Sequence, residues 1–166
     1  MAVHKQSEVE HAVKGGVIAG LVSGLVILVV LAIINAVEGK DVLVGLKFAS
    51  VPFLGKRVFE PGFDHVAIVA GVVSHMAVSM FWGTLFGLLF FGHGKGMTLL
   101  AGAFWGLAVW VVMLYVALPL LGFPPGGNNP VAMAIFTHVL FGVTIAAAFL
   151  PFQRELPPVQ RPTPTH

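Results

Sequence analysis

Two histidines, His75 and His138, are the side chains of this sequence that could do chemistry inside a membrane. Each lies in a long apolar run, about nine and about seven residues from its start. If the runs are helical, both imidazoles lie about 10–14 Å below the same membrane face. A neutral imidazole can ligate a metal, carry a proton or form a hydrogen bond, so this pair is the first candidate for a site.

One hypothesis is that His75 and His138 are the axial ligands of haem b, because imidazoles from facing helices commonly hold this group. The haem iron would be the only metal. A structural hydrogen bond or a quinone contact is one alternative, and a proton relay or another metal site is a second. A flat macrocycle also needs clearance, and the residues one helical turn away on each histidine's stripe are small. They are Gly71 and Ser79 beside His75, and Ala134 and Gly142 beside His138.

The elements that must position these histidines are four apolar runs without a charged side chain. Of the 166 residues, 57% are hydrophobic and 10% are charged, and the mean hydropathy is +0.95, which is typical of an integral membrane protein. Each run is long enough to cross about 30 Å of hydrocarbon as a helix, and its continuous apolar character argues against a barrel. We predict an all-α fold, a four-helix transmembrane bundle forming one domain over residues 1–152. The predicted spans are residues 15–37, 66–91, 96–121 and 131–152.

The segments outside the runs differ in composition. Residues 41–59 mix charges with apolar side chains, which predicts an interfacial segment between the first two helices, with a plain surface loop as the alternative. Residues 122–130 are rich in proline and glycine, which predicts a tight turn between antiparallel third and fourth helices. Residues 153–166 are proline-rich, which predicts an extended tail.

Glycines spaced four apart mark where the helices are expected to touch, because small residues let membrane helices approach closely. The spacing leaves open whether the partner helix belongs to this chain or to another subunit. The expected packing residues are Gly16, Gly20, Gly24, Gly83, Gly87, Gly102 and Gly106.

The two halves of the chain also resemble each other, which predicts two repeated helical hairpins, with chance similarity as the alternative. The matching pairs are Lys14-Gly15 with Lys95-Gly96, Ala19-Gly20 with Ala101-Gly102, and Ser74-His75 with Thr137-His138.

The pattern Ala-Gly-x-x-x-Gly in the first and third helices, with a histidine and spaced glycines in the second and fourth, resembles small uncharacterised bacterial inner-membrane proteins of the YagU-like type. The resemblance covers most of residues 12–150. The fourth helix departs from the pattern at Ala146 and Ala148, where glycine is expected. The resemblance implies four helices in a bacterial membrane and assigns no chemistry.

Basic residues near the helix ends predict the orientation. Those of the N-terminal segment, of the loop at Lys95 and of the C-terminal tail share one side. We predict a multi-pass protein of the bacterial inner (cytoplasmic) membrane with both termini in the cytoplasm. The expected partners are membrane lipid and other membrane subunits, because a net charge of +2 is too small to favour nucleic acid.

Enzymatic catalysis is not expected, because the apolar runs contain no Asp, Glu, Lys or Arg and the chain has no cysteine. Two functions remain. The first is an accessory or structural subunit of a larger membrane complex, expected to be respiratory or otherwise energy-converting. The second is an electron carrier that holds haem b between His75 and His138.

Overall fold

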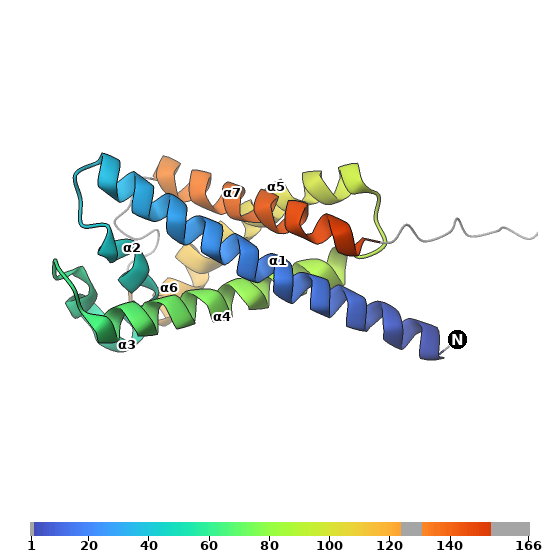
Figure 1. Ribbon diagram of the computed structural model, residues 1–166, viewed down its shortest axis with the longest axis horizontal. Coiled ribbons are helices and arrows are strands. Elements are labelled where there is room, and N and C mark those ends of the chain that lie inside the picture. Colours follow the sequence, from blue (N-terminus) through green and yellow to red (C-terminus); the bar gives the residue numbers. More distant parts are fainter. Residues whose placement is uncertain (1, 124–130, 154–166) are drawn as a thin grey trace, which may run out of the picture.

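The computed structural model describes residues 2–123 and 131–153. Across these two ranges the chain is helical, without a strand. Four helices there are long and apolar enough to span a membrane, as the sequence predicts (Figure 1). They are α1 (Ala2–Val37), α4 (His65–Phe90), α5 (Lys95–Val112), which continues to Leu120, and α7 (Val131–Phe149).

Helix α1 begins at Ala2, well before the predicted start of its span at residue 15. Charged residues end an apolar run, but Glu and Lys are good helix formers, so they do not end a helix. With 36 residues α1 is about 54 Å long, which exceeds the thickness of a bilayer core. Figure 1 shows its N-terminal end continuing past the ends of α4 and α7.

The last turns of the third span are irregular. A π-helical turn, η3 (Met113–Ala117), follows α5, and the short α6 (Leu118–Leu120) follows η3. Pro119 lacks an N–H and cannot bond to the carbonyl of Tyr115, so the regular hydrogen-bond ladder is interrupted here. Of the predicted turn at 122–130, only Gly122 and Phe123 lie within the described residues, as does only Gln153 of the predicted tail.

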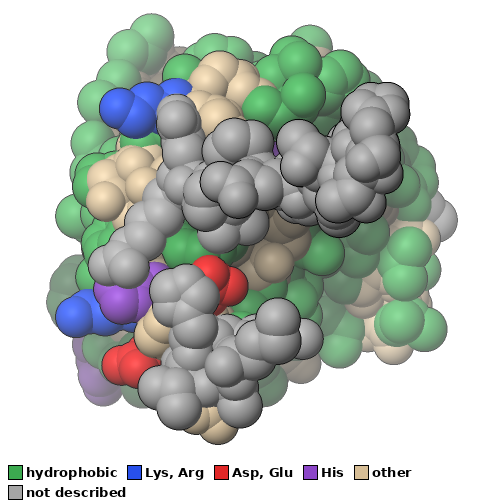
Figure 2. Space-filling model, turned by 90° about the vertical axis from the view of Figure 1, so that its right-hand side faces the viewer, with side chains coloured by type: hydrophobic (Ala, Val, Ile, Leu, Met, Phe, Trp, Pro, Cys, Tyr) green, Lys and Arg blue, Asp and Glu red, His purple; other side chains and the backbone are tan. Residues whose placement is uncertain are grey.

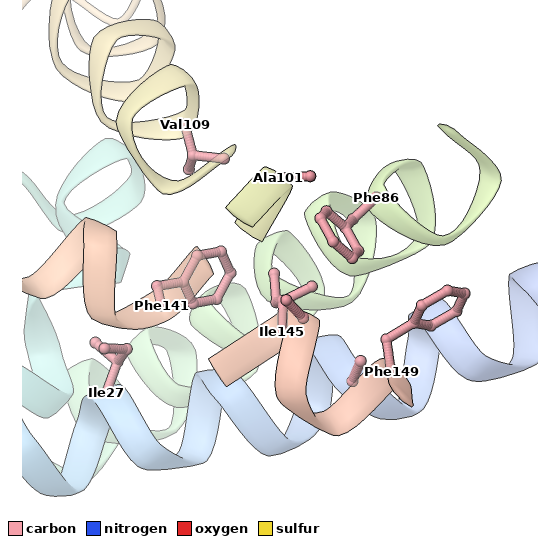
Figure 3. Packing of buried hydrophobic residues seen from close by; sticks show 9 residues of the cluster. Ile27, Phe86, Ala101, Val109, Phe141, Ile145 and Phe149 are labelled. Carbon is pink, nitrogen blue, oxygen red and sulfur yellow. The ribbon is translucent and has the colours of Figure 1, made fainter. Parts of the chain in front are cut away.

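The four long helices pack as two close pairs, α1 with α4 and α5 with α7, and α1 also packs along α7. Between the pairs lies a core of apolar side chains (Figure 3). Ile27 reaches it from α1, Phe86 from α4 and Val109 from α5, while α7 contributes Phe141, Ile145 and Phe149. The last turn of the fourth span, η4 (Leu150–Phe152), packs back on Gly15.

Residues 38–64, here called the cap, connect α1 to α4 through short helical pieces rather than as an open loop. These are α2 (Leu43–Lys47), η1 (Phe48–Ser50), α3 (Val51–Leu54) and η2 (Gly55–Phe59). The α2 and η1 pieces pack against α4, and α2 also contacts α1. The cap therefore lies at the end of the molecule opposite the N-terminus (Figure 1).

Candidate functional site

The predicted packing glycines all find their partner helix within this chain. Gly16, Gly20 and Gly24 of α1 face α4, where Gly83 and Gly87 meet the α1 backbone. In the second pair, Gly102 and Gly106 of α5 face Gly142 and the backbone at His138 of α7. A Cβ at any of the seven predicted packing glycines would collide with a neighbour, and in all but Gly24 the nearest contacts include backbone atoms. These small residues hold the chain's own helices together and offer no free stripe to another subunit.

His75 is a bridge between two helices. Its Nε2 donates a hydrogen bond to the carbonyl of Gly24 at 3.0 Å, joining α4 to α1. A carbonyl oxygen only accepts, so Nε2 carries the proton, and in a neutral ring Nδ1 is left as an acceptor. The ring is partly buried.

His138 bonds within its own helix. Its Nδ1 donates to the carbonyl of Ala134 at 2.7 Å, which leaves Nε2 as the acceptor of a neutral ring. The backbone at His138 packs on Gly106. The two histidines therefore hold different partners, His75 on a facing helix and His138 on its own.

The four residues predicted to provide clearance are occupied by helix packing. Gly71 meets the backbone of Leu46 and Lys47, Ser79 packs on Gly24, and Gly142 meets the backbone of Gly102 and Gly106. Ala134 is buried and accepts the His138 hydrogen bond. At Gly71, Ser79 and Gly142 the space beside the helix is therefore filled by a neighbouring segment.

The residues around His75 and His138 consequently do not fit a haem in this arrangement. The pattern of His138 suits a ligand, because Nδ1 bonds to a carbonyl and Nε2 is available. His75 has the opposite pattern, since its Nε2 is the atom bonded to Gly24. A macrocycle would also need the space that the packed glycines fill. Within the described ranges, no group of three or more His, Asp or Glu side chains could hold a metal ion.

Aromatic side chains fill the seam between α4 and α5. The ring of Trp105 makes edge contacts with Trp82, Phe86 and Phe90 at centroid distances of 5.7–6.1 Å. Further along, Trp110 makes an edge contact with Tyr115 in η3. The indole nitrogens of Trp105 and Trp110 are buried without a hydrogen-bond partner among the described residues.

A polar cluster in the cap was not predicted from the sequence. The side chain of Lys47 is fully buried, and its Nζ donates to the carbonyls of Glu60 and Gly62 at 2.5 and 3.2 Å. The carboxylate of Asp41 lies 3.7 Å from the same Nζ and accepts the backbone N–H groups of Leu43 and Gly62. Lys47 thus fastens one end of the cap to the other. Its position inside an apolar stretch, Leu43 to Phe48, is the only sequence signal of its burial.

A second carboxylate secures the start of α4. Asp64 accepts the N–H groups of Val66 and Ala67 as the N-cap of the helix, and it pairs with Arg57 through two hydrogen bonds. The N–H of Ala67 and the Arg57 guanidinium lower the pKa of the Asp64 carboxyl. Hydrogen bonds from Leu43 and Gly62 likewise lower the pKa of Asp41, with Lys47 contributing. In the folded cap, the surroundings of both carboxyl groups therefore favour their ionised form.

At the opposite end of the molecule, Gln153 joins the two helix pairs. Its Nε2 donates to the carbonyl of Phe90 and to the hydroxyl of Thr98, and its Oε1 accepts the N–H of Gly92, all at 2.7–2.9 Å. The end of the fourth span is therefore tied to the turn between α4 and α5.

Comparison with protein-family models, with curated proteins and with solved structures finds no significant match. The resemblance to YagU-like proteins therefore stays a prediction, and the function has to be argued from the geometry of this chain.

Proposed function

We propose that this chain is a non-enzymatic accessory subunit of a larger membrane complex. The proposal rests on one observation. The four spanning helices pack on one another, while α1 extends beyond them. The packing glycines and the hydrogen bond of His75 are used within the chain. The end of α1 extends past the ends of α4 and α7, where a second protein could pack against it.

The projecting part of α1 comprises residues 2–11. Ala12 of α1 makes a close backbone contact with another helix, since its carbonyl packs against Gly87 of α4. Before it, the side chains of Gln6, Val9 and Glu10 are exposed. Figure 2 views this end and shows acidic, basic and histidine side chains beside one another, with apolar side chains over the flanks. Because an isolated helical end is marginal in water, packing against a second protein would stabilise it.

We also infer that the core is a four-helix bundle of two repeated hairpins. Supporting this, Gly20 faces Ser79 in the first pair as Gly102 faces Gly142 in the second. Ser79 and Gly142 each lie four residues after the histidine of their own helix. The register of small residues relative to the histidine is therefore the same in both pairs. The bacterial inner membrane and the cytoplasmic placement of both termini are part of the same proposal.

Native electrophoresis after extraction in a mild detergent tests the accessory role. The wild-type chain should migrate with a larger assembly. Glu10→Pro, which breaks the projecting helix without touching the core, should shift the chain to its own mass. Gly96→Ala is the matched control, because a Cβ there meets no atom within 4 Å, and it should leave the assembly intact.

Migration of the wild-type chain alone under these conditions would contradict the proposal. If the larger assembly forms, the proteins that migrate with it show whether the complex is respiratory or otherwise energy-converting, as the sequence analysis expects.

A further inference from the structure

We propose that the cap is a lipid-binding wedge, whose exposed phenylalanines insert between the headgroups and acyl chains of the leaflet at that end of the protein. The proposal concerns residues 38–64 alone and does not depend on the accessory role.

The depth of the cap follows from two contacts. On one side, the backbone of Leu46 and Lys47 packs against Gly71, six residues inside α4. On the other side, Gly45 packs against Leu31 and Asn35 of α1, and Leu31 lies six residues before the end of that helix. Six residues of helix correspond to about 9 Å. Helix α2 thus sits between two spanning helices, at about the depth where interfacial segments lie in a bilayer.

The cap separates its side chains into an inner and an outer set. The inner side chains Lys47, Ser50, Val51 and Val58 are buried. The outer set is aromatic, with Phe53 and Phe63 exposed over 73% and 80% of their surface and Phe48 and Phe59 over 38% and 50%. Water hydrates exposed aromatic rings poorly, whereas the interfacial region of a bilayer accommodates them well.

The surface next to the cap is lipid-facing in character. On α4, Val66, Val69 and Val73 form an exposed stripe at the same depth, beginning directly after Phe63 and Asp64. The charges of the cap are balanced, with four basic and four acidic residues in 38–64. The inner polar groups are bonded to one another, because Lys47 is held by Asp41 and by the carbonyls of Glu60 and Gly62. A neutral, internally bonded segment with outward phenylalanines fits a lipid surface better than a charged protein surface.

Spin labelling tests the proposal directly, because the chain contains no cysteine and single substitutions give no background. Phe53→Cys and Phe63→Cys are labelled with a nitroxide in the full-length protein, reconstituted in vesicles of phosphatidylcholine and phosphatidylglycerol. Glu60→Cys, exposed in the same cap, is the matched control. Collision rates with oxygen, which concentrates in lipid, and with a water-soluble nickel chelate are measured by power saturation.

Labels at 53 and 63 should collide several-fold more with oxygen than with the nickel chelate, while the label at 60 should show the reverse. Equal access of the chelate to all three positions would overturn the proposal. Protection of positions 53 and 63 from both reagents in native membranes, but not in vesicles, would also overturn it, because a protein partner would then cover the cap.

A second variant separates the wedge from general folding. Lys47→Met removes the buried ammonium group that bonds to the carbonyls of Glu60 and Gly62, and it should raise the access of the chelate to labels at 53 and 63. A label introduced by Val111→Cys, at an exposed position of the third span, should keep its access to lipid. If chelate access at 53 and 63 is unchanged in this variant, the hydrogen bonds of Lys47 do not hold the two phenylalanines at their depth.

Discussion

The two helix pairs share one packing scheme but differ in what surrounds it. In both, glycines let an antiparallel helix approach at the level of a histidine. The first pair adds a hydrogen bond across the interface from His75, a structured cap and a projecting helix end. The second pair has an intrahelical histidine bond and a π-helical turn before Pro119. The comparison indicates that the glycines determine the core, while the first pair carries the features directed to lipid and partners.

Enlarging a packing glycine should have the largest effect, and of similar size in both pairs. Gly83→Val in the first pair and Gly142→Val in the second place branched side chains against backbone carbonyls and Cα atoms of the facing helix. Each should lower the free energy of unfolding by about 3 kcal/mol or more, because the obstructing atoms are backbone and cannot move aside locally. Unfolding in mixed detergent micelles, followed by circular dichroism, measures the loss.

Gly96→Val controls for the change of residue type, because a Cβ there meets open space. A small effect of Gly142→Val beside a large effect of Gly83→Val would break the equivalence of the two pairs.

Removing the buried cation should affect the first pair alone. Lys47→Met leaves the carbonyls of Glu60 and Gly62, and the carboxylate of Asp41, without their cation inside the cap. The expected loss is about 2–3 kcal/mol, since a partner is removed from buried polar groups. Hydrogen exchange should accelerate across the cap and the start of α4. Lys56→Met, at an exposed position of the same cap, should leave exchange unchanged.

Acid should loosen the cap before it affects the second pair. Folding lowers the pKa of Asp41 and Asp64 below the ordinary value of 3.8, so their stabilising contribution is fully present above that value. It is lost as the pH falls from 3.8 through the lower, folded pKa values. Residues 91–123 and 131–153 contain no Asp or Glu, so α5 and α7 have no such group to protonate.

Hydrogen exchange at low pH provides the measurement. The amides of Leu43, Gly62 and Ala67, which bond to these carboxylates, should lose protection while those of α5 keep it. Simultaneous loss in both pairs would show that the cap and the core unfold as one unit.

The sequence predicts the elements of this fold better than their partners. The helical spans follow from the apolar runs because a backbone in lipid has to satisfy its own hydrogen bonds. The predicted span begins at residue 15, because Glu8, Glu10 and Lys14 end the apolar run, whereas the helix itself begins at Ala2. Glycine spacing predicts close contacts at Gly16 and Gly83, but a contact between residues far apart in sequence depends on how the helices are arranged.

The candidate site was predicted only in its residue types. The depth of His75 and His138 in the membrane is predicted by counting residues along their helices. The orientation of each ring, which brings one to Gly24 and the other to Ala134, depends on tertiary packing. The small residues around them have two interpretations, cofactor clearance and helix contact, and the structure shows helix contact. The burial of Lys47 does not follow from the sequence, because it depends on Glu60 and Gly62 folding back over it.

The smallest predicted effect sharpens the contrast between the two histidines. His75→Ala removes a hydrogen bond between α4 and α1 and should cost about 1 kcal/mol, as membrane interhelical bonds do. His138→Ala should cost less, because the carbonyl of Ala134 is already placed to accept the helical N–H four residues on. Both variants remove the same side-chain volume, so the difference between their unfolding free energies reports the bond itself. Equal losses would mean that both rings serve only to fill space. Reduced-minus-oxidised absorption of the same preparations completes the comparison, since a haem signal that disappears in both variants would show an arrangement of the two rings unlike the one described here.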